Sequence, residues 1–289
     1  MKANLYALAA IALWASLSAL GVALSHVPPF LLTGAALMIG SVLAWPFVLA
    51  DRRQWRIAPA TLGLGVFSLF GFHFLLFIGL RLAPAVEVNL INYLWPLLIV
   101  VLAPLYLPAV RLRPAHLLAA TMGFAGAAIA IFGGREAPIG LTSGTQWSTW
   151  LGYGLGLGSA FVWANYSLQT KRLSLKARGF PTAAIGLFGL VSGILALICH
   201  AALEPATALS ARDCGLLTLL GLGPLGAAFF LWDKALKLGD ARHIGILSYL
   251  TPLASTALLM LVSGRALSAS IALAAALIIG AALVGTRAT

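Results

Sequence analysis

Apolar residues occur in long runs that are separated by short polar or charged connections. Ten runs of about 20 residues follow one another, at 3–22, 29–50, 57–80, 84–106, 115–133, 147–170, 181–203, 214–236, 241–263 and 267–286. A helix of that length crosses the hydrocarbon core of a bilayer. The pattern therefore predicts an all-α integral membrane protein with ten transmembrane helices. No convincing cleavage site follows the first run, so we expect it to be retained.

The composition agrees with a membrane protein. Of the 289 residues, 61% are hydrophobic and only 9% are charged. A water-soluble domain with that balance would have too little polar surface to cover itself. The net charge of +11 would suggest a nucleic-acid partner in a soluble protein, so the placement of the basic residues has to decide.

The basic residues lie mainly on one side of the predicted membrane. With the N-terminus in the cytoplasm, 14 of the 18 Lys and Arg residues fall on the cytoplasmic side. The four that fall outside are Arg81, Arg135, Arg212 and Arg265. This asymmetry is typical of the positive-inside rule, and it predicts that both termini are cytoplasmic. We therefore expect the lipid bilayer, and no nucleic acid, as a macromolecular partner.

Two parts of the chain resemble each other. Residues 77–97 align without gaps with residues 233–253, and seven of the 21 positions are identical. Roughly two identities would arise by chance, and the shared pattern Tyr-Leu-x-Pro-Leu, at Tyr93 and at Tyr249, uses rarer residues. A weaker match joins Trp14-Ala15 to Trp163-Ala164. The chain is therefore predicted to be a duplication.

A repeat of five helices has an odd number of crossings, so the second copy enters the membrane from the opposite side. We predict a first repeat at 1–134, an outer connecting loop at 135–146 and a second repeat at 147–289. Inverted repeats of this kind occur mostly in secondary transporters, with the substrate site between the repeats near the middle of the membrane.

With these features the chain resembles the drug/metabolite transporter superfamily, and within it the EamA type, over essentially its whole length. The segment Asn89-Leu90-Ile91-Asn92-Tyr93-Leu94-Trp95-Pro96 resembles the helix 4 signature of the YddG-type amino-acid exporters. Trp163 matches the aromatic residue of that subgroup in helix 6. The resemblance implies export of aromatic and other neutral amino acids across the bacterial inner membrane through a central cavity. Trp95 is included in the expected site because of this resemblance.

Pro96 and Pro252 fall in the middle of apolar runs, where a proline removes a backbone hydrogen bond and kinks the helix. Polar residues share the same helical faces, namely Asn89, Asn92 and Tyr93 in one half and Gly245, Ser248 and Tyr249 in the other. We predict that these two polar faces line a common cavity and that the two prolines act as hinges. The alternative is that the prolines are tolerated packing kinks and that the Asn side chains bond to neighbouring helices.

Trp14 and Trp163 lie too deep in their helices for interfacial anchors, so we expect them to form apolar walls of the cavity. His73 is the only titratable residue well inside its helix, and its counterpart in the repeat is Phe229. Either His73 takes part in binding or it makes a satisfied bond between helices. Glu87 and Asp233 are interpreted as charges at helix ends.

The absence of certain residues disfavours several classes of protein. The helices that hold Trp14 and Trp163 carry no carboxylate, which disfavours an antiporter of organic cations. Basic residues lie at helix ends rather than deep in the cavity, which disfavours a phosphate-ester exchanger. No set of His and Cys has metal-ligand spacing and no nucleophile with a base is visible, so we expect no metal, no cofactor and no enzyme.

Two remaining features have alternatives. Gly152, Gly154, Gly156 and Gly158 contain two overlapping Gly-x-x-x-Gly pairs, which favour close packing inside the bundle over a dimer face. Cys199 and Cys214 fall near the same side, where free thiols are favoured over a disulfide. The oligomeric state is left open, with a monomer as the working expectation.

The sequence thus predicts an exporter of amino acids that works by alternating access. The residues expected to bind the substrate are Trp14, His73, Asn92, Tyr93, Trp95, Trp163, Ser248 and Tyr249. The alternatives are an exporter of another small neutral metabolite or drug, a passive channel, and a membrane enzyme built around Asp233 and His243.

Overall fold

The computed structural model describes residues 1–133, 146–176, 178–263 and 269–288, and within them every regular element is a helix. The first half holds α1 Lys2–Ala15, α2 Leu17–Ala23, α3 Pro29–Ser41, α4 Trp45–Ala50, α5 Pro59–Leu82, α6 Ala85–Asn92, α7 Trp95–Tyr106 and α8 Pro114–Gly133. The second half holds α9 Gln146–Leu175, α10 Ala184–Leu203, α11 Ala211–Leu222, α12 Ala228–Leu238, α13 Ala241–Leu247, α14 Leu250–Ser263 and α15 Ala269–Ala288.

The described chain also has three short helical elements. The 3-10 helices η1 Val42–Ala44 and η2 Arg52–Trp55 flank α4, and the π-helix η3 Gly223–Ala227 joins α11 to α12. The predicted loop at 135–146 and the residues Arg135 and Arg265 fall outside the described residues, apart from residue 146, which begins α9.

Seven segments of the described chain are helical, long and apolar enough to cross a membrane. They are Lys2–Ala23, Pro29–Ala50, Pro59–Leu82, Glu87–Tyr106, Pro114–Phe132, Ala184–Leu203 and Ala211–Leu238. The other three predicted segments are also helical where they are described, in α9, in α13 with α14, and in α15. The all-helical membrane class is therefore confirmed, while ten crossings remain a prediction.

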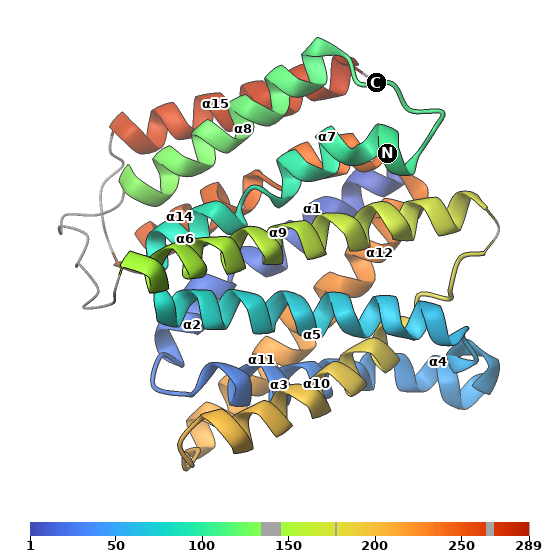
Figure 1. Ribbon diagram of the computed structural model, residues 1–289, viewed down its shortest axis with the longest axis vertical. Coiled ribbons are helices and arrows are strands. Elements are labelled where there is room, and N and C mark those ends of the chain that lie inside the picture. The colour runs from blue at the N-terminus through green and yellow to red at the C-terminus, as the bar shows by residue number, and fades with distance from the viewer. Residues whose placement is uncertain (134–145, 177, 264–268, 289) are drawn as a thin grey trace.

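Helices from the two halves pack against each other in pairs. The principal contacts join α8 to α15, α3 to α10, α5 to α9, α1 to α12 and α7 to α13. Figure 1 shows α8 and α15 side by side at one edge of the bundle, with α3, α10 and α11 toward the other. The helix α1 begins at the same end of the bundle at which α15 ends (Figure 1). Each half therefore packs mainly against the other half.

Glycines allow α9 to approach α6 and the end of α5 closely. A Cβ atom added at Gly152 would lie 2.6 Å from the Cβ of Ala83, and one at Gly156 would lie 3.1 Å from Val88 Cγ1. A Cβ atom at Gly154 would meet nothing within 4 Å. The Gly152 and Gly156 pair is therefore a packing contact within the bundle, whereas Gly154 faces open space.

The outer surface is rich in large apolar side chains. Leu49 is 78% exposed, Leu105 is 76% exposed and Trp147 is 77% exposed. A monomeric soluble protein rarely carries so many such side chains on its surface, whereas hydrocarbon solvates them well. Cys199 and Cys214 are both free thiols.

Candidate functional site

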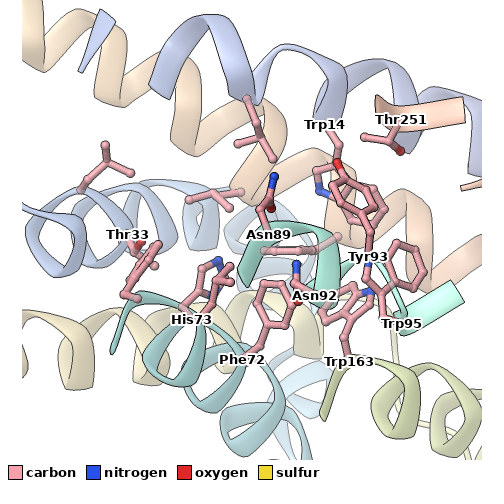
Figure 2. Close-up of a pocket in the computed structure, with 16 residues that line it drawn as sticks. Trp14, Thr33, Phe72, His73, Asn89, Asn92, Tyr93, Trp95, Trp163 and Thr251 are labelled. Carbon is pink, nitrogen blue, oxygen red and sulfur yellow. The ribbon is translucent and has the colours of Figure 1, made fainter. Parts of the chain in front are cut away.

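A cavity of about 320 Å³ lies between the two halves of the bundle (Figure 2). It is lined by Trp14, Leu17, Leu32, Thr33, Phe72, His73, Leu76, Phe77, Asn89, Asn92, Tyr93, Trp95, Trp163, Leu225, Phe229 and Thr251. Six of the eight residues predicted to bind a substrate line it, which are Trp14, His73, Asn92, Tyr93, Trp95 and Trp163. They come from α1, α5, α6, α7 and α9 and from the break between α6 and α7.

Helix breaks accompany the two prolines. The helix α6 ends at Asn92, and α7 begins at Trp95 with Pro96 as its second residue. In the second half α13 ends at Leu247, and α14 begins at Leu250 with Pro252 as its third residue. A proline in the first turn of a helix has no intrahelical partner to lose, so each proline starts a helix after a short break. The predicted kinks within continuous helices are therefore breaks between two helices.

Aromatic rings form one wall of the cavity. The ring of Trp163 lies 5.5 Å from that of Phe229, 5.6 Å from that of Phe72 and 6.0 Å from that of Trp14, measured between centroids. Trp95 meets Trp163 edge to face at 6.4 Å. Tilted and edge-to-face pairs are favourable aromatic arrangements, and together they give the cavity an apolar aromatic wall.

The π-helix η3 fixes the orientation of Trp14. A π-turn leaves backbone carbonyls outside the regular α-helical pattern, and such turns occur often at functional sites. Here the carbonyl oxygen of Pro224 accepts a hydrogen bond from Trp14 Nε1 at 3.1 Å. The indole is only 8% exposed, so this bond satisfies its single polar group.

A buried serine orients Asn92. Ser159 Oγ lies 2.8 Å from Asn92 Oδ1 and 2.7 Å from the carbonyl oxygen of Gly156. The carboxamide oxygen of Asn92 is thus engaged as an acceptor by α9. Its NH2 group remains as a donor beside the cavity, where it suits a carboxylate or another acceptor (Figure 2).

The neighbouring backbone defines the tautomer of His73. His73 Nδ1 lies 2.6 Å from the carbonyl oxygen of Leu69, and a carbonyl can only accept, so Nδ1 carries the hydrogen. In the neutral ring Nε2 is then an acceptor. The bond to Leu69 lies within α5, so it does not join two helices, and His73 also lines the cavity.

The cavity contains no permanent charge. Its polar groups are hydroxyls, amides, one imidazole and indole edges, and none of its lining residues is Asp, Glu, Lys or Arg. A bound molecule with a net charge would have no opposite charge beside it, which is unfavourable away from water. The arrangement therefore suits a molecule without net charge that has both an apolar surface and hydrogen-bonding groups.

Ser248 and Tyr249 are not among the lining residues. Tyr249 is fully buried and packs with Ala127 and Ile278, and Ser248 Oγ donates to the carbonyl of Gly245 at 2.6 Å. The two residues form the break between α13 and α14, so the regular helical spacing from Gly245 to Pro252 does not hold across it. From α13 and α14 the residue that lines the cavity is instead Thr251, the counterpart of Trp95 in the repeat.

The other ten lining residues were not in the predicted substrate-binding set, and Phe72, Phe229 and Thr33 are among them. Phe229 had a signal, because it is the repeat counterpart of His73. The helices that hold Phe72 and Thr33 are apolar on every side, so their periodicity does not indicate which face is turned inward.

Two buried carboxylates lie at helix ends. Asp233, interpreted as an ordinary terminal charge, has no exposed side-chain surface and pairs with Lys237 at 2.7 Å. Glu204, which the sequence did not single out, pairs with Arg81 at 2.7 Å and accepts from the backbone N–H groups of Phe30 and Leu31. The length of an apolar run and the charges at its ends do not show that such carboxylates are covered by neighbouring helices.

A third ion pair ties two connections together. Arg242 binds the carboxylate of Asp240 and donates through Nη1 to the carbonyl of Arg111 at 2.8 Å. The pair thereby joins the α12–α13 connection to the α7–α8 connection. Although burial favours the neutral acid, the hydrogen bonds and charge of Arg242 hold the pKa of the Asp240 carboxyl below its usual range.

The comparisons with known proteins agree with this architecture. The model of the EamA-like transporter family matches residues 1–132 and 150–286. A protein of Ancylobacter novellus named "Aromatic amino acid exporter YddG" is 36% identical over 99% of this chain and 97% of its own length. A protein of Salmonella typhimurium with the same name is 30% identical over 93% of this chain and 91% of its own length. A crystal structure that is 36% identical superposes with a TM-score of 0.90 over 100% of this chain and 97% of that chain.

The chain belongs to the EamA-like transporter family. It is therefore a multi-pass membrane transporter and not an enzyme. The predicted resemblance to EamA-type transporters, and to the YddG-type exporters among them, is confirmed.

Proposed function

We propose that this protein exports amino acids, aromatic and other neutral ones, from the cytoplasm across the bacterial inner membrane. The observation that carries the proposal is the uncharged cavity between the two halves, which is lined by aromatic rings together with amide and imidazole groups. A zwitterionic amino acid has no net charge. It offers a carboxylate, an ammonium and, in phenylalanine, a flat apolar ring.

Each part of such a substrate has a suitable group in the cavity. The Asn92 amide donates to the carboxylate, and Nε2 of His73 accepts from the ammonium. The side chain of the substrate packs against Trp163, with Trp14 and Trp95 beside it. Tyr93 lines the same cavity next to the helix break. The names of the two relatives support this substrate class.

Two inverted repeats of five helices, with both termini in the cytoplasm, form the proposed architecture. Three observations support it. Two of the principal contacts, α8 with α15 and α3 with α10, join a helix of one half to its counterpart in the other. The breaks after Asn92 and after Leu247 occupy matching places in the two halves. The basic residues concentrate on one side.

Alternating access is the proposed mechanism, in which the halves rock about the central site. The breaks beside Pro96 and Pro252 are the proposed hinges, because short interruptions between helices absorb backbone rotation at low cost. The residues of the cavity would then face one side of the membrane at a time.

The test is uptake of labelled phenylalanine into liposomes that hold the purified protein. The liposomes are preloaded either with unlabelled amino acids or with buffer, and protein-free liposomes serve as the control. Saturable uptake that preloaded amino acid accelerates is the expected result, and the preloaded compounds that accelerate it define the substrate range. Linear flux that is indifferent to preloading would identify a channel. No flux above protein-free liposomes would point to a different metabolite.

A further inference from the structure

A second polar cluster lies at the end of α12 that is remote from the cavity. Asp233 Oδ2 accepts from Lys237 Nζ at 2.7 Å and from Thr182 Oγ1 at 2.7 Å. Lys237 also donates to the carbonyl of Phe180 at 2.7 Å. The side chain of Asp233 has no exposed surface, whereas that of Lys237 is 17% exposed. The pair joins α12 to the segment before α10, and its lysine is exposed in part at the surface of the molecule.

The pair has unused hydrogen-bonding capacity on both partners. Asp233 Oδ1 is buried without a hydrogen-bond partner. The ammonium of Lys237 has three N–H donors, of which two are engaged by Asp233 and by Phe180. Most buried polar atoms are hydrogen-bonded, so an unpartnered carboxylate oxygen in this position calls for an explanation.

Aromatic side chains separate this pair from the cavity. Phe229 lines the cavity, and Lys237 lies about 12 Å further along α12 at the rise of an α-helix. Between them Trp232 is fully buried, with its ring 5.2 Å from that of Trp14 and 5.5 Å from that of Trp95. Along α12, Trp232 and then the ion pair therefore lie between the cavity and this end of the bundle.

We propose that the Asp233–Lys237 pair is a zwitterion-selective gate, which an α-amino acid opens by exchanging partners with it. The carboxylate of the substrate binds Lys237, and its ammonium binds the free oxygen of Asp233. The inference rests on the proposed function, because it assumes an amino acid as the substrate. It adds a second selective step, away from the cavity.

Charge compensation is the physical reason for the selectivity. Breaking a buried ion pair leaves two uncompensated charges, which is strongly unfavourable. An amino acid carries an opposite charge for each partner on one carbon atom, so every charge stays paired while the gate opens. An amine or a carboxylate alone compensates one partner and leaves the other unpaired. The gate should therefore reject both.

The repeat places a cation at the equivalent position of the other half. Lys237 aligns with Arg81, which binds the buried carboxylate of Glu204 at the opposite end of the bundle. Each end thus carries one partly exposed cation paired with a fully covered carboxylate. The Lys237 side chain is 17% exposed and the Arg81 side chain is 40% exposed. The two ends differ in one respect: both oxygens of Glu204 are engaged by Arg81, His200 and backbone N–H groups, whereas Asp233 keeps a free oxygen.

The test is charge complementation in liposomes. Uptake of labelled phenylalanine, phenethylamine and 3-phenylpropanoate is measured for the parent protein, Asp233→Asn and Lys237→Met, with the rate in protein-free liposomes subtracted. The parent should carry phenylalanine at least about tenfold faster than either analogue. Asp233→Asn should gain 3-phenylpropanoate uptake, because only Lys237 then needs a partner. Lys237→Met should gain phenethylamine uptake for the converse reason.

Lys234→Met is the matched control, since it removes the same charge from an exposed position on the same helix. It should keep the selectivity of the parent. Opposite gains in the two gate variants cannot come from misfolding. If both variants lose all three activities in the same proportion, or keep the preference of the parent, the pair is structural and the gate is refuted. If the parent itself carries no amino acid, the proposed function fails first.

Discussion

Replacing Ser159 by alanine should weaken substrate binding without disturbing the fold. Ser159 Oγ lies 2.8 Å from Asn92 Oδ1, and both side chains are buried. The change removes the contact that keeps the Asn92 amide group turned toward the cavity. The remaining amide is free to rotate, so part of the population presents an oxygen where a carboxylate needs a donor.

The expected loss of binding free energy in Ser159→Ala follows from one hydrogen bond. A buried neutral hydrogen bond contributes about 0.5–1.5 kcal/mol net. The single hydroxyl proton of Ser159 is shared between Asn92 and the carbonyl of Gly156 at 2.7 Å, so the lower half of that range applies. We expect KM for phenylalanine to rise about two- to fivefold with little change in maximal rate.

The assay is the concentration dependence of phenylalanine counterflow in a double-mutant cycle of Ser159→Ala and Asn92→Ala. Because Ser159 acts through Asn92, the serine change should have no further effect once Asn92 is absent. Ser192→Ala is the matched control, a fully buried serine on α10 whose hydroxyl has no partner. An equal rise in KM in both backgrounds would refute the orienting role of Ser159.

Three further predictions concern binding, packing and pH. Trp163→Ala should lower phenylalanine transport at least about tenfold, whereas Trp147→Ala, at a site 77% exposed, should not; normal transport by a well-folded Trp163→Ala would remove that residue from the site. Gly152→Leu should destabilise the protein by about 1–3 kcal/mol in thermal melts and Gly154→Leu should not, because only the first position meets Ala83; equal melting temperatures would contradict the packing. The Asp240 carboxyl has a lowered pKa. Its contribution to the stability of the folded protein is therefore complete above about pH 4 and is lost as the pH falls further. The stability advantage of the parent over Asp240→Asn should therefore shrink in melts at decreasing pH, and a constant advantage would show that ionisation is irrelevant.

Much of the lining of the cavity follows from local sequence patterns. Asn92 and Tyr93 were found because polar residues are costly inside apolar runs and a proline near them marks a break, whereas Trp95 was added by the family resemblance. The depth of Trp14 and Trp163 in their helices added these two residues, which line the cavity together. Such residues stand out against an apolar background, whatever their partners are.

Other features needed the packed structure. Tyr249 has the same sequence context as Tyr93, yet it packs against Ala127 and Ile278, whereas Tyr93 faces the cavity. Phe72 lies on a helix that is apolar all round, so no periodic signal distinguishes the side facing the cavity from the side facing lipid. The burial of Asp233 likewise depends on segments more than 50 positions away along the chain.

The sequence by itself determined that the chain is helical, that it lies in a membrane and that a few polar and aromatic residues meet at its centre. Long apolar runs and rare polar residues are local properties, and the cost of exposing backbone groups to hydrocarbon leaves helices as the solution. The tertiary structure decided which face of each apolar helix lines the cavity and how Asp233 and Lys237 are covered. Those choices depend on contacts between distant helices, which hydrophobic periodicity does not specify when every face of a helix is apolar.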